Sequence, residues 1–347
     1  MNNPIIGRTA VAVASLTLLL GAAPVGAQSP TAAALAEPVS IDFVAGQIGI
    51  TFYTGVECGA RAAAADHNVN LGYNGSHNWN PDESRAVIEA FQANQPQGWV
   101  LSPTDPDSFE RFVTTEMAAG RPVVTIDAPM TSPVELANMQ SDHYKGGQLA
   151  AQAMLEQTGG AGSYLVLHMQ PGLPDIGGRA DGFRDTMTAA GSKVLEYVYP
   201  GTDTAKASSD VTAAVAGNPD LAGVYATHES AALGAATGLR DSGQQGTIKL
   251  IAFDASPEQV NDLKSGVYDA LIAQQPYDMG YNSVRLVADT IRAGVIDTAA
   301  VVHDQPTGFA VITRENAYQP DIIKFIYPAD LNACPTGAPA PAASAAP

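Results

Sequence analysis

The sequence predicts an α/β fold with parallel β-sheets that are covered by helices. Short apolar segments alternate along the chain with longer segments of helical periodicity, and Gly, Pro, Asn or Asp follows most of the short ones. The short segments are almost continuously apolar, which is typical of strands buried on both faces. The 347 residues, 46% of them apolar, are enough for about two such domains.

The expected strands and helices follow one another in a regular order. Strands are expected at 41–45, 69–73, 98–101, 123–126, 164–168, 194–199, 223–226, 250–253 and 270–273. Helices are expected at 55–66, 81–93, 108–119, 144–158, 180–190, 205–216, 230–241, 257–265 and 279–293. The β-α order is interrupted near 136–142 and then resumes. This interruption favours two similar lobes over one long sheet.

The N-terminal residues are expected to direct export. Arg8 precedes an apolar run over 10–20, and the small residues at 25–27 form a cleavage pattern, so residues 1–27 are predicted to be a secretory signal peptide. A single membrane anchor is the alternative. It is disfavoured because the apolar run is shorter than the ~20 residues that span a bilayer.

Two other segments are expected to lie outside the folded body. Residues 335–347 contain mainly Ala and Pro and no large apolar side chain, so a disordered tail is expected. The stretch 28–38 has a similar composition and is expected to be flexible. The folded body is therefore expected to run from about Val39 to Asn332.

Composition and motifs exclude several classes of function. With 17 Lys and Arg against 35 Asp and Glu, the net charge is −18, which disfavours nucleic-acid binding. Two cysteines cannot form a four-cysteine zinc site, and the six histidines show no metal-ligand spacing. The sequence contains no G-x-S-x-G or H-E-x-x-H motif. We therefore expect no enzyme activity, no metal site and no cofactor.

Nine short motifs along the chain are similar to those of a known family. They are Ile41-Asp-Phe-Val, Phe52-Tyr53-x-Gly55, Ser102-Pro-Thr-Asp105, Pro122-Val-Val-Thr-Ile-Asp127, Ser141-Asp142-x-x-x-Gly146-Gly147, Arg179-Ala-Asp-Gly-Phe183, Ala232-Leu-Gly-Ala235, Ala252-Phe-Asp254 and Ile272-Ala-Gln274-Gln-Pro276. In this order they resemble the ribose/galactose-type (type I) periplasmic solute-binding proteins of ABC importers. The resemblance covers nearly the whole folded body. It implies two Rossmann-like lobes joined by three hinge crossovers.

The resemblance also implies lobe boundaries and a mode of action. The crossovers are expected near Ser141, Gln274 and His303. The N-terminal lobe is then 39–141 plus 275–303, and the C-terminal lobe is 142–274 plus 304–334. Such a protein closes its lobes on a small solute and delivers the solute to an ABC permease without performing chemistry. We expect a periplasmic monomer.

The resemblance implies roles for five residues at the ends of strands, where doubly wound sheets bind ligands. Asp127 and Asp254 are expected to accept hydrogen bonds from ligand hydroxyls, Gln274 to lie at the lobe junction, and Phe52 and Tyr53 to stack on the ligand. The alternatives are strand-end caps for the aspartates, ordinary core packing for the rings and a hinge amide for the glutamine.

The chain also departs from the family pattern. Gly49-Ile50 replaces an asparagine pair, and His228 replaces an asparagine. Ala128 and Gly177 stand at or near positions that carry arginines in the family. Because guanidinium groups are strong donors to sugar oxygens, we expect a less polar pocket that suits a polyol, a deoxy or modified sugar, or a partly apolar solute.

Four further side chains are candidates for the ligand site. His228 is expected to bind a ligand oxygen with a pH-dependent affinity, a backbone-bonded histidine being the alternative. Trp79 and His77 are expected to form a lip over the ligand, packing against a helix being the alternative. Asp175 is expected to reach the cleft. Arg179 opens a helix and is expected to be structural.

The two cysteines are expected to be linked. In an oxidising periplasm, Cys58 and Cys334 would form a disulfide that clamps the C-terminal extension to the first lobe, two free thiols being the alternative.

The expected function is that of an exported protein that captures a small neutral solute, above all a sugar or polyol, for an ABC permease. One alternative is a less polar solute. Another is a sensory binding protein that presents its ligand to a chemoreceptor or a sensor kinase, because the same fold serves both tasks. A transcriptional regulator is disfavoured by the export signal and by the lack of an N-terminal helix-turn-helix.

Overall fold

The computed structural model describes residues 37–171 and 174–335, and it describes the side chains of all of these except 174 and 175. The predicted signal peptide over 1–27, most of the segment 28–38 and the tail after residue 335 lie outside the described residues. The described residues fall within one unit of the structure, Ala36–Pro347. No helix among them is both long and apolar enough to cross a membrane.

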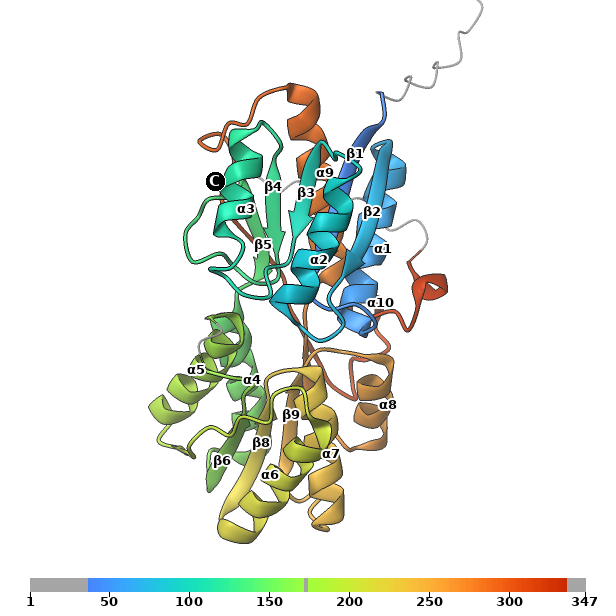
Figure 1. Cartoon of the computed structure of the whole chain (residues 1–347). Coiled ribbons are helices and arrows are strands. Elements are labelled where there is room, and N and C mark those ends of the chain that lie inside the picture. The colour runs from blue at the N-terminus through green and yellow to red at the C-terminus, as the bar shows by residue number, and fades with distance from the viewer. Residues whose placement is uncertain (1–36, 172–173, 336–347) are drawn as a thin grey trace, which may run out of the picture. The chain divides into compact units, whose positions relative to one another are not determined.

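The first lobe is built on a six-stranded parallel sheet in the order β11-β5-β4-β3-β1-β2. Its strands are β1 (Val39–Ala45), β2 (Val69–Gly75), β3 (Gly98–Leu101), β4 (Val123–Ile126), β5 (Ala137–Ser141) and β11 (Asp304–Thr307). Four helices cover the sheet, namely α1 (Thr51–Asp66), α2 (Pro81–Gln92), α3 (Glu110–Ala118) and α9 (Pro276–Ala293). Figure 1 shows α2 and α3 on one face, with α1 and α9 on the other.

Side chains of the first sheet alternate between two apolar cores. Phe43 and Val100 pack with α1 and α9, whereas Val44, Trp99 and Leu101 pack against α2 and α3. This alternation follows from the two-residue period of a strand. Because both faces are covered, β3 and β4 in the middle of the sheet read as almost continuously apolar in the sequence.

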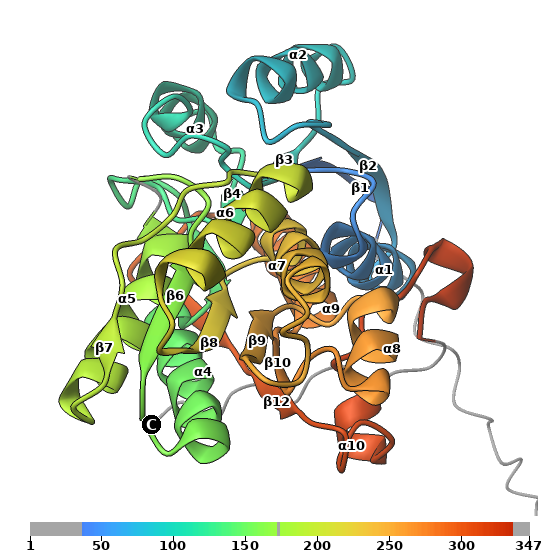
Figure 2. The same ribbon diagram turned by 90° about the horizontal axis from the view of Figure 1, so that it is seen from below.

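The second lobe repeats the same plan on another six-stranded sheet, in the order β12-β10-β9-β8-β6-β7. Its strands are β6 (Ser163–Leu167), β7 (Lys193–Val194), β8 (Leu221–Ala226), β9 (Lys249–Phe253), β10 (Ala270–Ala273) and β12 (Ala310–Ile312), the last of which runs antiparallel. Its helices are α4 (His143–Thr158), α5 (Pro174–Ala189), α6 (Thr204–Gly217), α7 (Glu229–Asp241) and α8 (Pro257–Ser265). Helices α4 and α5 pack in one apolar core of this sheet, and α6 and α7 pack in the other. Figure 2 shows the two pairs of helices. The predicted α/β fold with two lobes is confirmed.

Two crossovers between the lobes follow β5 and β10. β5 ends at Ser141 in the first sheet, and α4 then packs on the second. β10 ends at Ala273 in the second sheet, and α9 then returns to the first, where Figure 1 shows it in orange among the blue and green elements. Each lobe is therefore built from segments that are distant in the sequence.

The third crossover lies later than expected. Residues 304–307 were assigned to the second lobe, but they form β11, which pairs in parallel with β5 of the first sheet. The chain then crosses and forms β12 in the second sheet. The prediction at His303 is wrong because β11 is polar and exposed at the edge of its sheet, so its sequence lacks the apolar signature of a strand.

The last part of the chain returns to the first lobe, which the predicted division did not include. After the short helix α10 (Pro320–Ile323), Phe325 packs in the core of the second lobe, whereas Tyr327 packs in the core of the first. The 3-10 helix η1 (Leu331–Ala333) follows, and Cys334 is joined to Cys58 of α1 by a disulfide with the Cα atoms 5.4 Å apart. Residues 327–334 thus form a fourth connection between the lobes.

Three other elements differ from the sequence-based expectation. The interruption near 136–142 contains β5, and the strand expected at 194–199 is reduced to the two residues of β7. α1 begins at Thr51 and not at Gly55, so Phe52 and Tyr53 lie in its first turn. Polar residues in β5 and the absence of a capping side chain at Ile50 explain why these boundaries are hard to read.

The disulfide is expected to stabilise the folded protein. It closes a loop of 276 residues, so cutting it enlarges the conformational freedom of the unfolded chain. A double Cys58→Ser, Cys334→Ser variant is expected to lose about 2–4 kcal/mol of unfolding free energy in urea titrations. The reduced wild-type protein should unfold at a similarly lowered urea concentration, while a reducing agent should not affect the variant. Equal midpoints for oxidised and reduced wild type would contradict the prediction.

Candidate functional site

A cavity of about 210 Å³ is lined by residues from both lobes at the carboxyl ends of the strands. Every predicted site residue lines it except His77 and Asp175, and the side chain of Asp175 lies outside the described residues. His77 is exposed and does not line the cavity. The lining residues are Gln47, Ile50, Phe52, Tyr53, Trp79, Asp127, Met169, Ile176, Arg179, Thr202, His228, Glu229, Ser230, Leu233, Asp254 and Gln274.

The first lobe contributes aromatic rings and one carboxylate. The Tyr53 hydroxyl donates to Oδ2 of Asp127 at 2.7 Å and lies 2.7 Å from Oγ of Ser102, from which it accepts. Burial and the neighbouring Asp127 carboxylate raise the pKa of Tyr53 well above its usual value, so the phenol stays protonated. The Tyr53 ring centre lies 5.1 Å from that of Phe52 and 6.3 Å from that of Trp79. These rings form one aromatic wall.

The second lobe is organised around Asp254. Its Oδ1 accepts from Nε2 of Gln274 at 3.1 Å and from the hydroxyl of Tyr327 at 3.0 Å, and its Oδ2 accepts from the backbone N–H of Glu229 at 3.2 Å. The Tyr327 hydroxyl in turn accepts from the backbone N–H of Gln274 at 3.2 Å. Asp254 is only 6% exposed, so these donors replace the water that it gives up.

Asp127 and Asp254 share an uncommon backbone conformation. Each directly follows a strand of its lobe and adopts a positive φ, +64° and +74° respectively. Aspartate tolerates this left-handed region better than most residues do. The backbone N–H of each donates to a carbonyl of the next strand, Met139 or Ile272, so both turns stay tied to the sheet. The same local geometry therefore presents a carboxylate from each lobe.

His228 has one nitrogen in a structural contact and one without a partner. It caps α7, where Nδ1 accepts from the N–H of Ala231 at 3.4 Å, so the neutral ring carries its proton on Nε2. Nε2 has no hydrogen-bond partner among the described residues. Burial, together with the nearby charge of Arg179, lowers the pKa of His228 to about 3. The expected titration of His228 between pH 5 and 8 is therefore wrong, and the ring is a neutral donor.

Two more polar atoms of the cavity wall lack partners among the described residues. They are Nε1 of Trp79, a donor, and Oε1 of Gln274, an acceptor. Gln274 is only 1% exposed, so leaving its carbonyl oxygen unpaired carries a free-energy penalty. A ligand with both donors and acceptors would remove this penalty.

Arg179 lines the cavity but is largely engaged with its own lobe. Its Nε donates to Nδ1 of His143 at 3.1 Å, its Nη1 donates to the carbonyl of Thr227 at 2.9 Å, and its guanidinium lies 4.1 Å from the centre of the Phe253 ring. Burial and the Arg179 charge hold the pKa of His143 well below its usual value. The neutral His143 then donates from Nε2 to the carbonyl oxygen of Asp127 at 3.3 Å. Arg179 thereby positions the Asp127 turn.

Glu229 and Tyr327 are site residues that the sequence analysis missed. Glu229 is the first residue of α7, and its Oε2 accepts from the hydroxyl of Thr51 at 3.3 Å, across the two lobes. Burial and the Asp254 carboxylate raise the pKa of Glu229 to about 7. The sequence did offer a signal for Glu229, because this residue lies shortly after the end of β8, at the start of α7. For Tyr327 no signal existed, because its sequence position lies outside every β-α unit.

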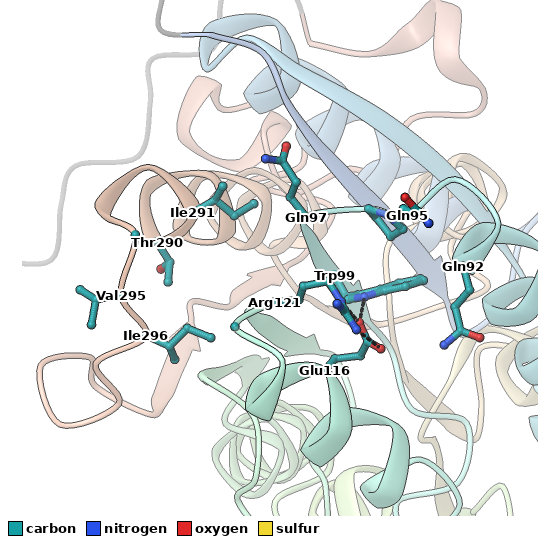
Figure 3. Close-up of a pocket in the computed structure, with 13 residues that line it drawn as sticks. Gln92, Gln95, Gln97, Trp99, Glu116, Arg121, Thr290, Ile291, Val295 and Ile296 are labelled. Atoms are coloured by element: carbon teal, nitrogen blue, oxygen red, sulfur yellow. Dashed lines mark hydrogen bonds and ion pairs between the residues drawn. The ribbon is translucent and has the colours of Figure 1, made fainter.

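A second cavity, of about 750 Å³, lies at the opposite edge of the first sheet. It opens beside the amino end of β3 and is shown in Figure 3. Nε1 of Trp99 donates to Glu116 at 2.8 Å, and the guanidinium of Arg121 forms an ion pair with the same carboxylate. Because these groups satisfy one another, they present no comparable set of unpaired donors and acceptors.

Replacing Glu229 should change the pH dependence of stability. A carboxyl whose pKa is raised on folding binds more protons in the folded than in the unfolded state, so its contribution to stability falls as the pH rises from about 4.5 to about 7. The unfolding free energy of Glu229→Gln, measured relative to that of the wild type, is therefore expected to be about 1–3 kcal/mol higher at pH 8 than at pH 5. Urea titrations at both pH values measure the difference. The exposed Glu89→Gln is the control, and a pH-independent difference for Glu229→Gln would refute the prediction.

Comparison with known proteins places the chain in a family. Residues 41–294 match the model of the periplasmic binding protein domain. An ABC transporter solute-binding protein from Agrobacterium vitis, solved with α-D-tagatopyranose, is 32% identical, with 83% of this chain and 99% of that chain covered and a TM-score of 0.78. Another from Agrobacterium vitis, solved with D-fucose, is 25% identical, with 83% and 100% covered and a TM-score of 0.76.

A curated relative gives the same result. The ribose import binding protein RbsB of Salmonella typhimurium (strain LT2) is 26% identical over 255 residues, which are 74% of this chain and 85% of RbsB. The resemblance predicted from the sequence motifs is thus confirmed. Because the family match spans most of the folded body, the chain belongs to the periplasmic binding protein family and is a binding protein, not an enzyme.

Proposed function

We propose that this protein captures a sugar or polyol in the cavity between its two lobes and delivers it to an ABC permease. The observation that carries the proposal is the set of unpaired donors and acceptors on the cavity wall, beside an aromatic face. His228 and Trp79 offer N–H groups, while Gln274 offers a carbonyl oxygen. Hydroxyl groups both donate and accept, so a polyhydroxylated solute satisfies all three.

The shape and lining of the cavity suit a small carbohydrate. At about 210 Å³ it is smaller than the cavities that take drug-sized ligands. The rings of Phe52, Tyr53 and Trp79 match the apolar C–H faces of a sugar. The similar proteins solved with α-D-tagatopyranose and with D-fucose support the same class.

Part of the cavity wall is apolar, which narrows the proposed ligand. Ile50, Ile176 and Leu233 line the cavity. Position 128 is alanine. Position 177 is glycine, and a Cβ atom added there would have one neighbour within 4 Å, Nε2 of His168 at 3.9 Å. Neither position supplies a guanidinium donor, so we propose a polyol, a deoxy sugar or a modified sugar over a fully polar hexose.

The family and the sequence support proposals about the partners and the compartment. Delivery to a permease is supported by relatives that are ABC transporter solute-binding proteins. We propose export by cleavage after Ala27, a periplasmic location and a monomeric state. Ligand binding would shift the lobes toward a closed population by rotation at the crossovers. Presentation of the ligand to a chemoreceptor or sensor kinase is the alternative, and a docking assay with either partner separates the two.

A thermal-shift screen tests the proposed ligand class. A ligand that binds only the folded state raises the melting temperature by mass action. Sugars, deoxy sugars, polyols, sugar acids and small apolar metabolites would be compared at equal concentration. Shifts confined to carbohydrates support the proposal, and shifts confined to apolar compounds contradict it.

Removing the Asp254 carboxylate is expected to weaken binding of the ligand found in that screen. Asp254→Ala leaves a ligand hydroxyl and the donors of Gln274 and Tyr327 unpaired, which costs about 1–3 kcal/mol, or about 5- to 150-fold in Kd. Asp127→Ala should have an effect of the same size. Isothermal titration calorimetry measures both, with the exposed Asp241→Asn of the second lobe as control. Wild-type affinity in both alanine variants would show that the ligand binds elsewhere.

A further inference from the structure

We infer that the solute taken up by this cavity carries a protonated amine, as in an amino sugar or an aminopolyol, and that Glu229 is the residue that selects it. The inference rests on the proposed function and describes the ligand of the same cavity more narrowly. The inferred ligand differs from a neutral sugar or polyol in that an ammonium group stands in place of one hydroxyl group.

The charges of the cavity wall favour a cation. Asp127, Glu229 and Asp254 contribute three carboxyl groups, against the single guanidinium of Arg179 among the lining residues. His228 adds no charge, because its ring is neutral. Two N–H groups of Arg179 already donate within the protein, and its plane lies over an aromatic ring. A solute with a carboxylate would add to the excess of negative charge, whereas an ammonium would offset it.

Glu229 is surrounded by acids and hydroxyls. Asp254 at the end of β9 and Glu258 of α8 are the charged groups that act on its carboxyl, and both raise its pKa. Thr51 of α1 and Ser256 before α8 offer it hydroxyl donors. An ammonium placed here would relieve the repulsion between carboxylates that now favours the protonated form.

The neighbouring acceptors suit the three N–H donors of an ammonium. The backbone N–H of Glu229 donates to Oδ2 of Asp254, the side-chain amide of Gln274 donates to its Oδ1, and all three residues line the cavity. The Asp254 carboxylate also acts on the Glu229 carboxyl, so the two acids lie near one another. Oε1 of Gln274 is buried and has no partner among the described residues. An ammonium donates three hydrogen bonds and accepts none. Glu229, Asp254 and Gln274 present the acceptors that it requires, and the aromatic wall adds cation–π attraction.

Matched ligand pairs test the inference. D-glucosamine, D-galactosamine and 1-amino-1-deoxy-D-sorbitol would be titrated into the purified protein beside D-glucose, D-galactose and D-sorbitol at pH 7. At least one amine should bind about tenfold or more tightly than its hydroxyl parent, because a charge-assisted hydrogen bond is stronger than a neutral one. Calorimetry in two buffers of different ionisation enthalpy should show proton release on binding, since the ammonium lowers the pKa of Glu229.

Two variants assign the preference to Glu229. Glu229→Gln should bring the amine and its hydroxyl parent to similar affinities and abolish the proton release, while a cooperative unfolding transition in urea shows that the variant is folded. Asp241→Asn removes a negative charge from an exposed position at the far end of α7 that does not line the cavity, and it should keep the preference within about twofold.

The remaining outcomes each count against a specific statement. If every hydroxyl parent binds as tightly as its amine, the amine inference fails while the proposed sugar or polyol function stands. An amine preference that survives in Glu229→Gln overturns the role of Glu229. If none of the six compounds binds and the thermal-shift screen of carbohydrates is also silent, the proposed function fails, and the inference fails with it.

Discussion

The Asp254 carboxylate is the interaction on which the arrangement of the site depends. Its three donors come from the first turn of α7, from the crossover at Gln274 and from the returning C-terminal segment at Tyr327. These segments are separated by tens of residues in the sequence, yet one buried carboxylate holds them together. Hydrogen bonds to an ionised acceptor are worth more than neutral ones, particularly at a site that is shielded from water. A change at Asp254 would therefore disturb the cavity wall, one crossover and the C-terminal return together.

The C-terminal return adds a constraint that two lobes and three crossovers do not have by themselves. Tyr327 reaches Asp254 with its hydroxyl, while its ring centre lies 5.9 Å from that of Phe52 in the first lobe. Seven residues later the chain is fastened to α1 through Cys334. Because α1 also carries Phe52 and Tyr53, the disulfide acts on the helix that bears the aromatic wall. Stability and ligand binding thus share one structural element.

The sequence allowed the fold to be predicted well where burial dictates the pattern. β3, β4 and β10 were predicted with their observed bounds, because both faces of these strands are covered and all their residues except Thr125 are apolar. The edge strand β11 is polar and half exposed, so nothing local distinguishes it from a loop. The C-terminal return was missed for a related reason. Its position is fixed by one disulfide and one tyrosine hydroxyl, which are long-range contacts without a periodic signature.

The candidate site shows the same division. Strand-end position and the family resemblance together selected Asp127, Asp254 and Gln274, and all three line one cavity because parallel strands end at the same edge of a sheet. Residue type was a poorer guide to protonation. His228 was expected to titrate near neutral pH, but burial beside Arg179 keeps it neutral, while Glu229 acquires a pKa near 7 from burial beside Asp254. The protonation behaviour expected of the histidine thus belongs to its neighbour in the chain.

The position of Glu229 links the choice of ligand to the contact between the lobes. Its carboxyl lines the cavity and also accepts from Thr51 at the start of α1, so a ligand group that engages it acts at one of the contacts between the two lobes. A cationic group would hold the carboxyl in its ionised form, and an ionised acceptor strengthens the Thr51 hydrogen bond. A neutral ligand leaves the carboxyl largely protonated near pH 6 and the hydrogen bond correspondingly weaker. On this argument the charge of the solute, and not only its shape, would set how firmly the lobes close around it.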